Sequence, residues 1–572
     1  MNWSLPPGPV LSLLAVSLLA AGGCSTRYYR KSADHEAYRV IGQKTPLVKN
    51  MDPHFTIEQT NRLSLDALPV VSQIEPALGA DGEAERGGRI LTLEQALVTA
   101  VQQSRVYQNN KEQLYLQALG LTLSRHQFAP IFAAGGDANY NFTTLKAVDF
   151  VPDPANPTNV IPDFILSQEE KVSGGSQVSV SKLLGFGTRL TAAFTTDFLR
   201  FLTGDPRTMT SSQLGATLVQ PLWRGAGYKA TLENLTQAEH NVLYALRDFT
   251  RFRKDFSVQI ATAYYNVLQN RDAVRNSFLN LQSSRRNAER TRELAREGRV
   301  TQADLGRLEQ QELSSEGNWI NAVRSYKQTL DNFKIQLGLT TDANVLLDDR
   351  ELQQLRIVHP DISVEDSIRV ALATRLDYQN LREQYEDAGR KMGVAANALR
   401  AQIDLVAAAG IDSSQEKSTR FPVPDFDRYH WNAGLNLNLP LERTAERNAY
   451  RASLIAYEST RRAFELRSDE IKLQVRDSWR ALDQAKRTFE ISEIGVRIAE
   501  RRVEEQNLLA ELGRAKAQDQ VDAQNDLVSS KNQLTQALVA HTISRLQFWN
   551  NLGILFIKEN GQWEEIADAK PK

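Results

Sequence analysis

The chain has 572 residues, and its 68 lysines and arginines nearly balance its 69 aspartates and glutamates, which gives a formal net charge of −1. This balance argues against a nucleic-acid-binding surface, because such a surface carries a basic excess. After about the first two dozen residues, no apolar run approaches the roughly 18 residues that a membrane-spanning helix needs. A helical transporter is therefore excluded, whereas a β-barrel, whose strands alternate apolar and polar residues, is not.

Residues 1–23 are predicted to be a lipoprotein signal peptide. The apolar stretch from Val10 to Ala21 has the length of a signal-peptide core, and small residues lead from it to Cys24. The segment resembles the lipobox of bacterial lipoproteins, in which the cysteine is acylated and becomes the first residue of the mature protein. Cys24 is the only cysteine, so no internal disulfide and no cysteine-based zinc site can form. The alternative is an ordinary secretory signal with an incidental cysteine.

The region after Cys24 is expected to be an extended lead segment. Residues 24–88 contain proline, glycine and charged residues without a sustained period. We therefore expect a segment that is ordered only partly, by packing on the main body of the protein.

The rest of the chain is predicted to be a duplicated unit. Residues 89–340 form the first copy, residues 341–361 a linker, residues 362–556 the second copy and residues 557–572 a tail. The helix openings of the two copies lie about 271 positions apart, and later features lie about 215 positions apart. The matching pairs are Leu91–Leu97 with Ile362–Ile368, Gly298-Arg299 with Gly513-Arg514, and Leu337-Gly338 with Leu552-Gly553.

Each copy contains a long helix with an apolar residue at every seventh position. From Gly227 to Glu297 the first helix would be roughly 100 Å long at 1.5 Å per residue, and a seven-residue repeat predicts a left-handed supercoil. The repeating positions are Ile260, Val267, Val274, Leu281 and Ala288 in the first copy, and Val475, Leu482, Phe489, Val496 and Val503 in the second.

Between these helices the apolar period changes to two, which predicts strands within about residues 131–220 and 402–439. In the second copy, Trp431, Leu435 and Leu437 alternate with asparagines. An apolar face opposite an amide-lined face is typical of a barrel with lipid outside and water inside, although a half-buried strand of a soluble sheet has the same pattern. An additional hairpin is expected from Gln177 to Phe198. If each copy donates two strands, a barrel can close only from several chains.

The ordered set of motifs resembles the TolC-like outer membrane efflux protein family over about residues 90–556. The resemblance implies a mainly α fold with a β-barrel portion: a homotrimer with a 12-stranded outer-membrane β-barrel that continues into a long periplasmic coiled-coil barrel. Such trimers are passive exit ducts of tripartite efflux pumps or type I secretion systems, with a periplasmic adaptor protein and an inner-membrane pump as partners. The motifs are Leu91–Leu97, Gln220–Gly225 with its echo Leu439-Pro440-Leu441, and the turn glycines Gly298 and Gly513.

Two kinds of site follow from the resemblance alone. Acidic residues six and nine positions after the second turn glycine narrow the periplasmic aperture in the family, and here they are Asp519 and Asp522. The two helical turns receive the adaptor in the family, which implies docking at Gly298, Arg299, Gly513 and Arg514. The plain alternatives are solvated surface carboxylates and simple turns.

No sequence motif indicates catalysis or a cofactor. The chain has no nucleotide-binding loop, no Gly-x-Ser-x-Gly and no His-Glu-x-x-His. The seven histidines are scattered, so we also expect no histidine-based metal site. We expect a channel rather than an enzyme, and the competing interpretation is a periplasmic coiled-coil scaffold lipoprotein without a pore. The transported substrate, and the choice between efflux and secretion, stay open.

Overall fold

The computed structural model describes residues 25–58, 65–72, 74–154, 156–203, 207–414, 421–512 and 514–564. The predicted signal peptide, Cys24 and Gly513 lie outside the described residues. The chain divides into two compact units, and each is described here by itself. The first unit comprises Met1–Ala118, Val242–Glu383 and Arg462–Lys572, and the second comprises Leu119–Asn241 and Gln384–Arg461.

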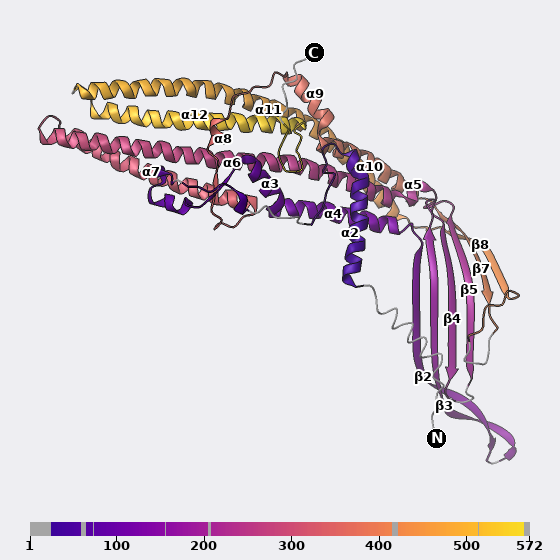
Figure 1. Ribbon diagram of the computed structural model, residues 1–572. Helices are drawn as coiled ribbons and strands as arrows, with labels where there is room; N and C mark the ends of the chain where they lie inside the picture. The colour runs from indigo at the N-terminus through magenta and orange to yellow at the C-terminus, as the bar shows by residue number, and fades with distance from the viewer. Residues whose placement is uncertain are drawn as a thin grey trace. The chain divides into compact units, whose positions relative to one another are not determined.

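Figure 1 shows the helices and strands, which are numbered along the chain. The helices are α2 (Thr26–Lys44), α3 (Leu93–Gln103), α4 (Arg105–His126), α5 (Tyr228–Thr231), α6 (Glu233–Arg296), α7 (Gln302–Leu337), α8 (Arg350–Gln353), α9 (Val364–Thr374), α10 (Leu376–Ala398), α11 (Thr444–Glu511) and α12 (Ala517–Leu552). The strands are β1 (Arg89–Leu91), β2 (Ile131–Asp153), β3 (Asn156–Leu183), β4 (Arg189–Phe201), β5 (Thr208–Pro221), β6 (Val345–Leu347), β7 (Gln402–Asp412) and β8 (Tyr429–Asn438). Short 3₁₀ segments cover Thr45–Leu47, Leu65–Ala67 and Pro76–Glu85.

The helices repeat between the two halves of the chain. Helices α3 and α9 both have 11 residues, and α7 and α12 both have 36. The long helices α6 and α11 have 64 and 68 residues. Each first short helix begins at a hydroxyl cap: Thr92 accepts from the backbone N–H of Gln95, and Ser363 accepts from that of Asp366. The duplication read from the sequence is therefore present in the helices.

The ends of α7 and α12 require glycine. Gly338 and Gly553 cap these helices in the left-handed conformation, with φ of 84° and 78°. A Cβ on Gly338 would lie 2.1 Å from the carbonyl oxygen of Gln103, at the end of α3. A Cβ on Gly553 would lie 3.0 Å from Oγ1 of Thr374, at the end of α9. Each capping glycine thus lets a long helix pack closely against the short helix of its own copy.

The heptad positions form the core of the first unit. All five positions of the first copy, from Ile260 to Ala288, are at most 1% exposed. In the second copy Val475, Leu482 and Val496 are buried, whereas Phe489 and Val503 are half-buried. The seven-residue period therefore correctly identified the buried seam.

The lead segment differs from the expected extended chain, because it begins with the helix α2. Only Ala37, Val40 and Ile41 of this helix are buried, so its apolar residues do not repeat with the 3.6-residue period of an amphipathic helix. Tertiary contacts hold it instead, since the hydroxyl of Tyr115 donates to the Asp34 carboxylate at 2.6 Å.

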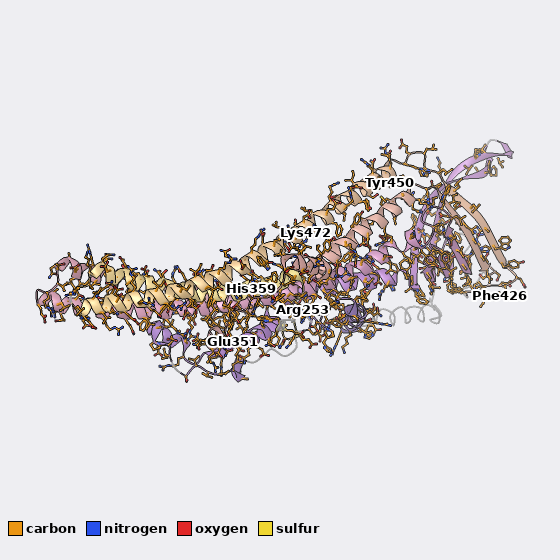
Figure 2. All side chains as sticks on the ribbon, turned by 90° about the horizontal axis from the view of Figure 1, so that it is seen from above. Arg253, Glu351, His359, Phe426, Tyr450 and Lys472 are labelled. Atoms are coloured by element: carbon orange, nitrogen blue, oxygen red, sulfur yellow. The ribbon has the colours of Figure 1, made fainter. Side chains whose placement is uncertain are left out.

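Further along the lead segment, Asn50 joins the two ends of the described chain. Its φ is 65°, a left-handed conformation that asparagine tolerates. Its side-chain amide donates to the carbonyl of Ile557 at 2.7 Å and accepts from the N–H of Ile557 at 2.9 Å. The buried Arg253 of α6 donates to the carbonyls of Asn50 and Lys558, and it is labelled in Figure 2. We call Asn50, Arg253, Ile557 and Lys558 the terminal clasp.

The lead segment also supplies β1, which pairs in parallel with β6 next to a charged cluster. Glu85 is buried, and its carboxylate accepts from Arg271 at 3.1 Å and from the hydroxyl of Tyr326 at 2.7 Å. Burial raises the pKa of Glu85, and the charge of Arg271 opposes this shift. Arg275 pairs with Glu75 at 2.6 Å and also contacts Asp349. These ion pairs attach the lead segment to α6.

The second unit contains one antiparallel sheet of six strands in the order β2-β3-β4-β5-β7-β8. The expected hairpin is present, but its strands β3 and β4 extend beyond Gln177 and Phe198. A trimeric barrel of twelve strands, which the family resemblance implies, needs four strands from each chain. The sheet of the described chain has six, which is two more. The hairpin of β3 and β4 accounts for the difference, because it lies between β2 and β5 within the sheet (Figure 1).

Among the described residues, no helix has the combination of length and apolar character needed to cross a membrane.

Candidate functional site

The six-stranded sheet has one apolar and one polar face. Cross-strand pairing puts Phe132, Val180 and Ala192 in one row, and Ala192 pairs in turn with Ala216. On the other side of the sheet, Ala409 pairs with Trp431. Because side chains alternate along a strand, every second residue lies on the same face. The larger apolar residues of this face are Phe132, Tyr140, Phe142, Val172, Val178, Val180, Leu190, Phe194, Leu214, Leu218, Leu405, Ile411, Trp431, Leu435 and Leu437.

Large apolar side chains of this face are exposed in the described chain. Phe132 is 78% exposed, Trp431 73% and Leu435 66%. From Phe132 to Phe142 the strand rises about 34 Å, and a tilt of about 40° reduces this to about 26 Å. That height matches the apolar band of about 25 Å on membrane barrels. The exposed Phe426, labelled in Figure 2, precedes β8 at one end of this band.

The opposite face is polar on every strand. Asp137 of β2 pairs in register with Gly175 of β3, which pairs with Asp197 of β4. A Cβ on Gly175 would lie 3.1 Å from a carboxylate oxygen of Asp137 and 3.4 Å from one of Asp197. The missing side chain thus leaves space for both carboxylates on this face. Other residues of the polar face are Asn139, Asn141, Gln177, Ser179, Thr195, Gln213, Gln402, Asp404, Asn432, Asn436 and Asn438.

The sheet ends in two edges. Strands β2 and β8 each pair with only one strand of the described chain. An open edge of this length presents unpaired backbone N–H and C=O groups, which another chain can complete.

Helix segments of the second unit are joined by polar contacts around Asp387, whose side chain is 3% exposed. His240 of α6 lies 2.8 Å from this carboxylate and Gln237 donates to it at 3.1 Å. Arg390 donates to Asp387 at 2.5 Å and to Glu233 at 3.2 Å. These contacts fix the start of α6 against α10.

The two helical turns named from the resemblance share one hydrogen-bond geometry. Gly298 has φ of 73°, and the N–H of Arg299 donates to the carbonyl of Leu294 at 2.9 Å. The N–H of Arg514 donates to the carbonyl of Leu509 at 2.8 Å, also five residues earlier. A Cβ on Gly298 would meet nothing within 4 Å. The turn at Gly298 is therefore exposed and is followed by an arginine.

Asp519 and Asp522 lie in the first two turns of α12 and are half-exposed. Ala517 and Val521 pack against Ala288 of α6 and Leu308 of α7. At 100° per residue, the two aspartates lie on roughly the opposite side of the helix from Ala517 and Val521. Within the described chain, they therefore lie away from the contact with α6 and α7. Gln518 donates to Asp522 at 2.9 Å.

The matching position of the first copy has a different role. Asp304 forms a reciprocal cap with Thr301 at the start of α7: its N–H donates to the threonine hydroxyl at 3.1 Å, and that hydroxyl donates to its carboxylate at 2.7 Å. Lys516, at the start of α12, makes no side-chain cap. The first copy therefore uses its aspartate for capping, whereas Lys516 gives the second copy no such cap.

Sequence reasoning did not identify an apolar stripe on α11. Ile491, Ile494, Ile498 and Leu508 are 70%, 49%, 61% and 62% exposed. The spacing of Ile491, Ile494 and Ile498 is that of a coiled-coil seam, and Leu508 continues it after two charged seam positions, Arg501 and Glu505. A second heptad-spaced search of α11, in addition to the one that found Val475 and Leu482, would have detected it.

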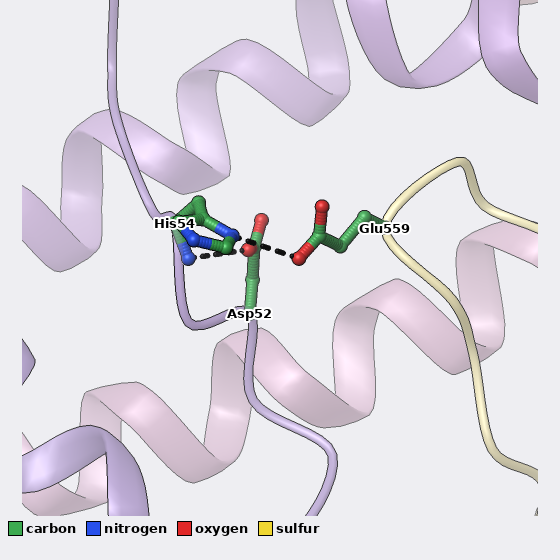
Figure 3. A group of neighbouring side chains, drawn as sticks. All are labelled: Asp52, His54 and Glu559. Carbon is green, nitrogen blue, oxygen red and sulfur yellow. Dashed lines mark hydrogen bonds and ion pairs between the residues drawn. The ribbon is translucent and has the colours of Figure 1, made fainter.

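One group of side chains has the spacing of a metal site. Asp52, His54 and Glu559 place one ligand atom each within 4.8 Å of one another (Figure 3). Nδ1 of His54 lies 2.9 Å from Glu559, and its backbone N–H donates to Asp52 at 2.9 Å. The hydrogen bond with Glu559 and its charge raise the pKa of His54. Nδ1 of the imidazole thus belongs to an exposed ion pair with Glu559, beside the terminal clasp.

Two histidines of the first unit lie close together. The ring centroids of His359 and His541 are 6.4 Å apart. His541 is fully buried in α12, and neither of its ring nitrogens has a hydrogen-bond partner among the described residues. Burial, with the positive charge of Arg545, lowers the pKa of His541 to about 4. The imidazole is therefore neutral at physiological pH.

Solved outer membrane channels have a similar structure. The CmeC outer membrane channel of Campylobacter jejuni matches 91% of this chain and 96% of its own, with a TM-score of 0.56 and 14% identity. The chain has the TolC-like fold. A membrane protein from Pseudomonas aeruginosa gives a TM-score of 0.59 at 13% identity, over 87% of this chain and 99% of its own. The MtrE outer membrane channel of Neisseria gonorrhoeae, solved in its open state, gives 0.53 at 12% identity, over 81% and 89%.

At the level of sequence, no family model matches the chain and no curated protein matches it. The structural neighbours confirm the expected TolC-like fold, mainly α with a β-sheet portion.

Proposed function

We propose that the chain forms a homotrimeric channel in the bacterial outer membrane and serves as the exit duct of a tripartite efflux or type I secretion system. The observation that carries the proposal is the two-faced sheet. Its apolar face, about 26 Å high along β2, matches the hydrocarbon layer, and its polar face suits a water-filled lumen. Transport through such a duct is passive, so the chain needs no catalytic group of its own.

The trimer is supported by surfaces that one chain leaves open. The two sheet edges need partners, and the stripe of Ile491, Ile494, Ile498 and Leu508 exposes apolar area on α11. On α7, Leu313 and Ile320 are 64% and 55% exposed at heptad spacing. A second copy of the chain would cover such surfaces by coiled-coil packing.

The periplasmic end of the duct is assigned to the helical turns. In a trimer, Asp519 and Asp522 would form two rings of three carboxylates, which favour cations over anions. Gly298 with Arg299, and Gly513 with Arg514, would form the tips that receive a periplasmic adaptor, which connects the duct to an inner-membrane pump.

The membrane attachment is assigned to two elements. The barrel supplies the stronger attachment, because a single lipid group holds a protein only weakly. Acylation of Cys24 adds a lipid anchor. Mass spectrometry of the mature N-terminus tests the second part. We expect an acylated Cys24, and an unmodified terminus elsewhere would refute the lipoprotein assignment without affecting the channel.

The experiment that tests the channel is electrophysiology on the full chain. The protein is extracted from outer membranes in detergent, checked for a heat-modifiable trimer and inserted into planar bilayers. We expect discrete, stable conductance steps that require the trimer. A water-soluble elongated monomer without conductance would refute the channel and favour the alternative, a periplasmic scaffold lipoprotein.

A further inference from the structure

We propose that the β3–β4 hairpin is part of the barrel wall, so that three chains of six strands close a barrel of eighteen strands with a wide, polar lumen. The inference rests on the proposed function, and it adds the size of the pore and the class of solute that fits it. The hairpin lies between β2 and β5 in the hydrogen-bonded order rather than beyond an edge. If it left the wall, the ladders of β2 with β3 and of β4 with β5 would both have to break.

The hairpin follows the same division of faces as the rest of the sheet. Val178 of β3 pairs with Ala134 of β2 and with Phe194 of β4, on the apolar face. Its neighbour Ser179 pairs with Ala133 and Ala193 on the other face, which also holds Gln177 and Thr195. If the hairpin had water on both sides, placing Val178 and Phe194 on the same face would bring no stabilisation. In a barrel wall that face contacts lipid.

Strand polarity also permits the insertion. An antiparallel barrel needs an even number of strands, and a hairpin adds two. Strand β5 therefore keeps the direction it would have if it followed β2 directly. Tyr140 of β2, Val172 of β3, Arg200 of β4 and Thr208 of β5 lie at one level. The inserted strands thus reach the same level as β2 and β5, whereas β7 and β8 end at the level of Gln213 of β5.

The extra strands widen the pore. At a strand spacing of about 4.8 Å and a tilt of about 40°, twelve strands give a backbone diameter of about 24 Å and eighteen give about 36 Å. The enclosed area therefore rises about 2.3-fold, into the size range of barrels that keep an aqueous channel. The lumen wall is rich in hydroxyl, amide and carboxylate groups such as Ser179, Gln177 and Asp197. Bulky hydrophilic solutes are the class that this lumen suits.

Paired single-cysteine variants of the full-length trimer test the position of the hairpin. Val178→Cys and Ser179→Cys are adjacent on β3 and point to opposite faces, and Leu435→Cys with Asn436→Cys is the matched pair on β8. Each is treated in liposomes with a membrane-impermeant maleimide, and the label is read at the individual peptide, which keeps Cys24 separate. We expect at least tenfold faster labelling of Ser179→Cys than of Val178→Cys, and a similar ratio for the β8 pair.

The two pairs distinguish the two proposals. If the β8 pair shows the ratio and the β3 pair labels equally, the hairpin lies outside the wall and the eighteen-strand barrel is refuted, while the channel stands. If both pairs label equally, the outer membrane barrel itself is refuted. As a second measurement, electron cryomicroscopy of the trimer counts the strands directly. A variant with residues 142–206 replaced by Asn-Gly should lose six of them, and a wall of twelve strands in the unaltered trimer would overturn the inference.

Discussion

Gly338 and Gly298 offer a matched test of how tightly the helices pack. Both residues have positive φ, 84° and 73°. An alanine at such a position costs about 1–2 kcal/mol in backbone conformation. At Gly298 the added methyl meets nothing within 4 Å, so the conformational cost is the whole cost. At Gly338 the methyl would lie 2.1 Å from the carbonyl oxygen of Gln103 and 2.9 Å from the backbone nitrogen of Ser104, so α3 must also move. Such overpacking adds roughly 1–3 kcal/mol.

We therefore expect Gly338→Ala to cost about 2–5 kcal/mol and Gly298→Ala about 1–2 kcal/mol. The measurement is the thermal loss of helical circular dichroism of the detergent-solubilised protein at one scan rate. Asparagine variants separate the two contributions, because asparagine tolerates positive φ. Gly298→Asn should be nearly neutral, whereas Gly338→Asn should remain strongly destabilising. Equal losses for the two alanine variants would refute the close contact between α7 and α3.

The other predictions concern the aperture, the terminal clasp and the buried histidine. Replacing both Asp519 and Asp522 by alanine should lower cation preference and divalent-cation block in planar bilayers without dissociating the trimer; unchanged selectivity and block would place the aperture elsewhere. Asn50→Ala removes two hydrogen bonds to Ile557, worth about 1–3 kcal/mol, so limited proteolysis should release the C-terminal segment faster, and wild-type rates would contradict the clasp. His541 has a lowered pKa, so the unfolded state binds more protons between pH 6.5 and 4, and stability falls as the pH falls through that window by up to about 3 kcal/mol. His541→Leu should flatten this dependence in thermal scans at several pH values, and an equally steep loss in the variant would assign it to other groups.

The helices and strands could be predicted from the sequence wherever one face of the element is apolar, because the apolar residues then repeat with the period of that element. Val267 and Val274 repeat at seven because one seam of α6 is buried, and Trp431 and Leu435 alternate with asparagines because β8 has two different faces. The outer part of β3 escaped prediction, because the run from Gln168 to Lys171 is polar on both faces and looks like a loop. There the strand pairs mainly with β2, and backbone hydrogen bonds rather than side-chain burial hold it.

Other features depended on contacts between distant parts of the chain. Helix α2 has too few apolar positions for a periodic signal, and its order comes from contacts such as that of Asp34 with Tyr115. The parallel pair of β1 and β6 joins segments about 250 residues apart, which no local pattern encodes. Among the candidate site residues, Gly298 and Arg299 lie in the turn between α6 and α7, and Asp519 and Asp522 lie near the start of α12. Their roles at an aperture and in adaptor binding remain predictions.

The terminal clasp has a consequence for the order of folding. Asn50 and Ile557 are 507 positions apart, so their hydrogen bonds can form only when nearly the whole chain has been delivered to the compartment where it folds. Closing so long a loop is entropically costly unless the helices between them have already assembled. The clasp therefore forms late in folding: a chain truncated before Ile557 would leave the side chain of Asn50 without its two hydrogen bonds to Ile557, and the buried Arg253 without the carbonyl of Lys558. Incomplete copies would then expose this defect to proteases.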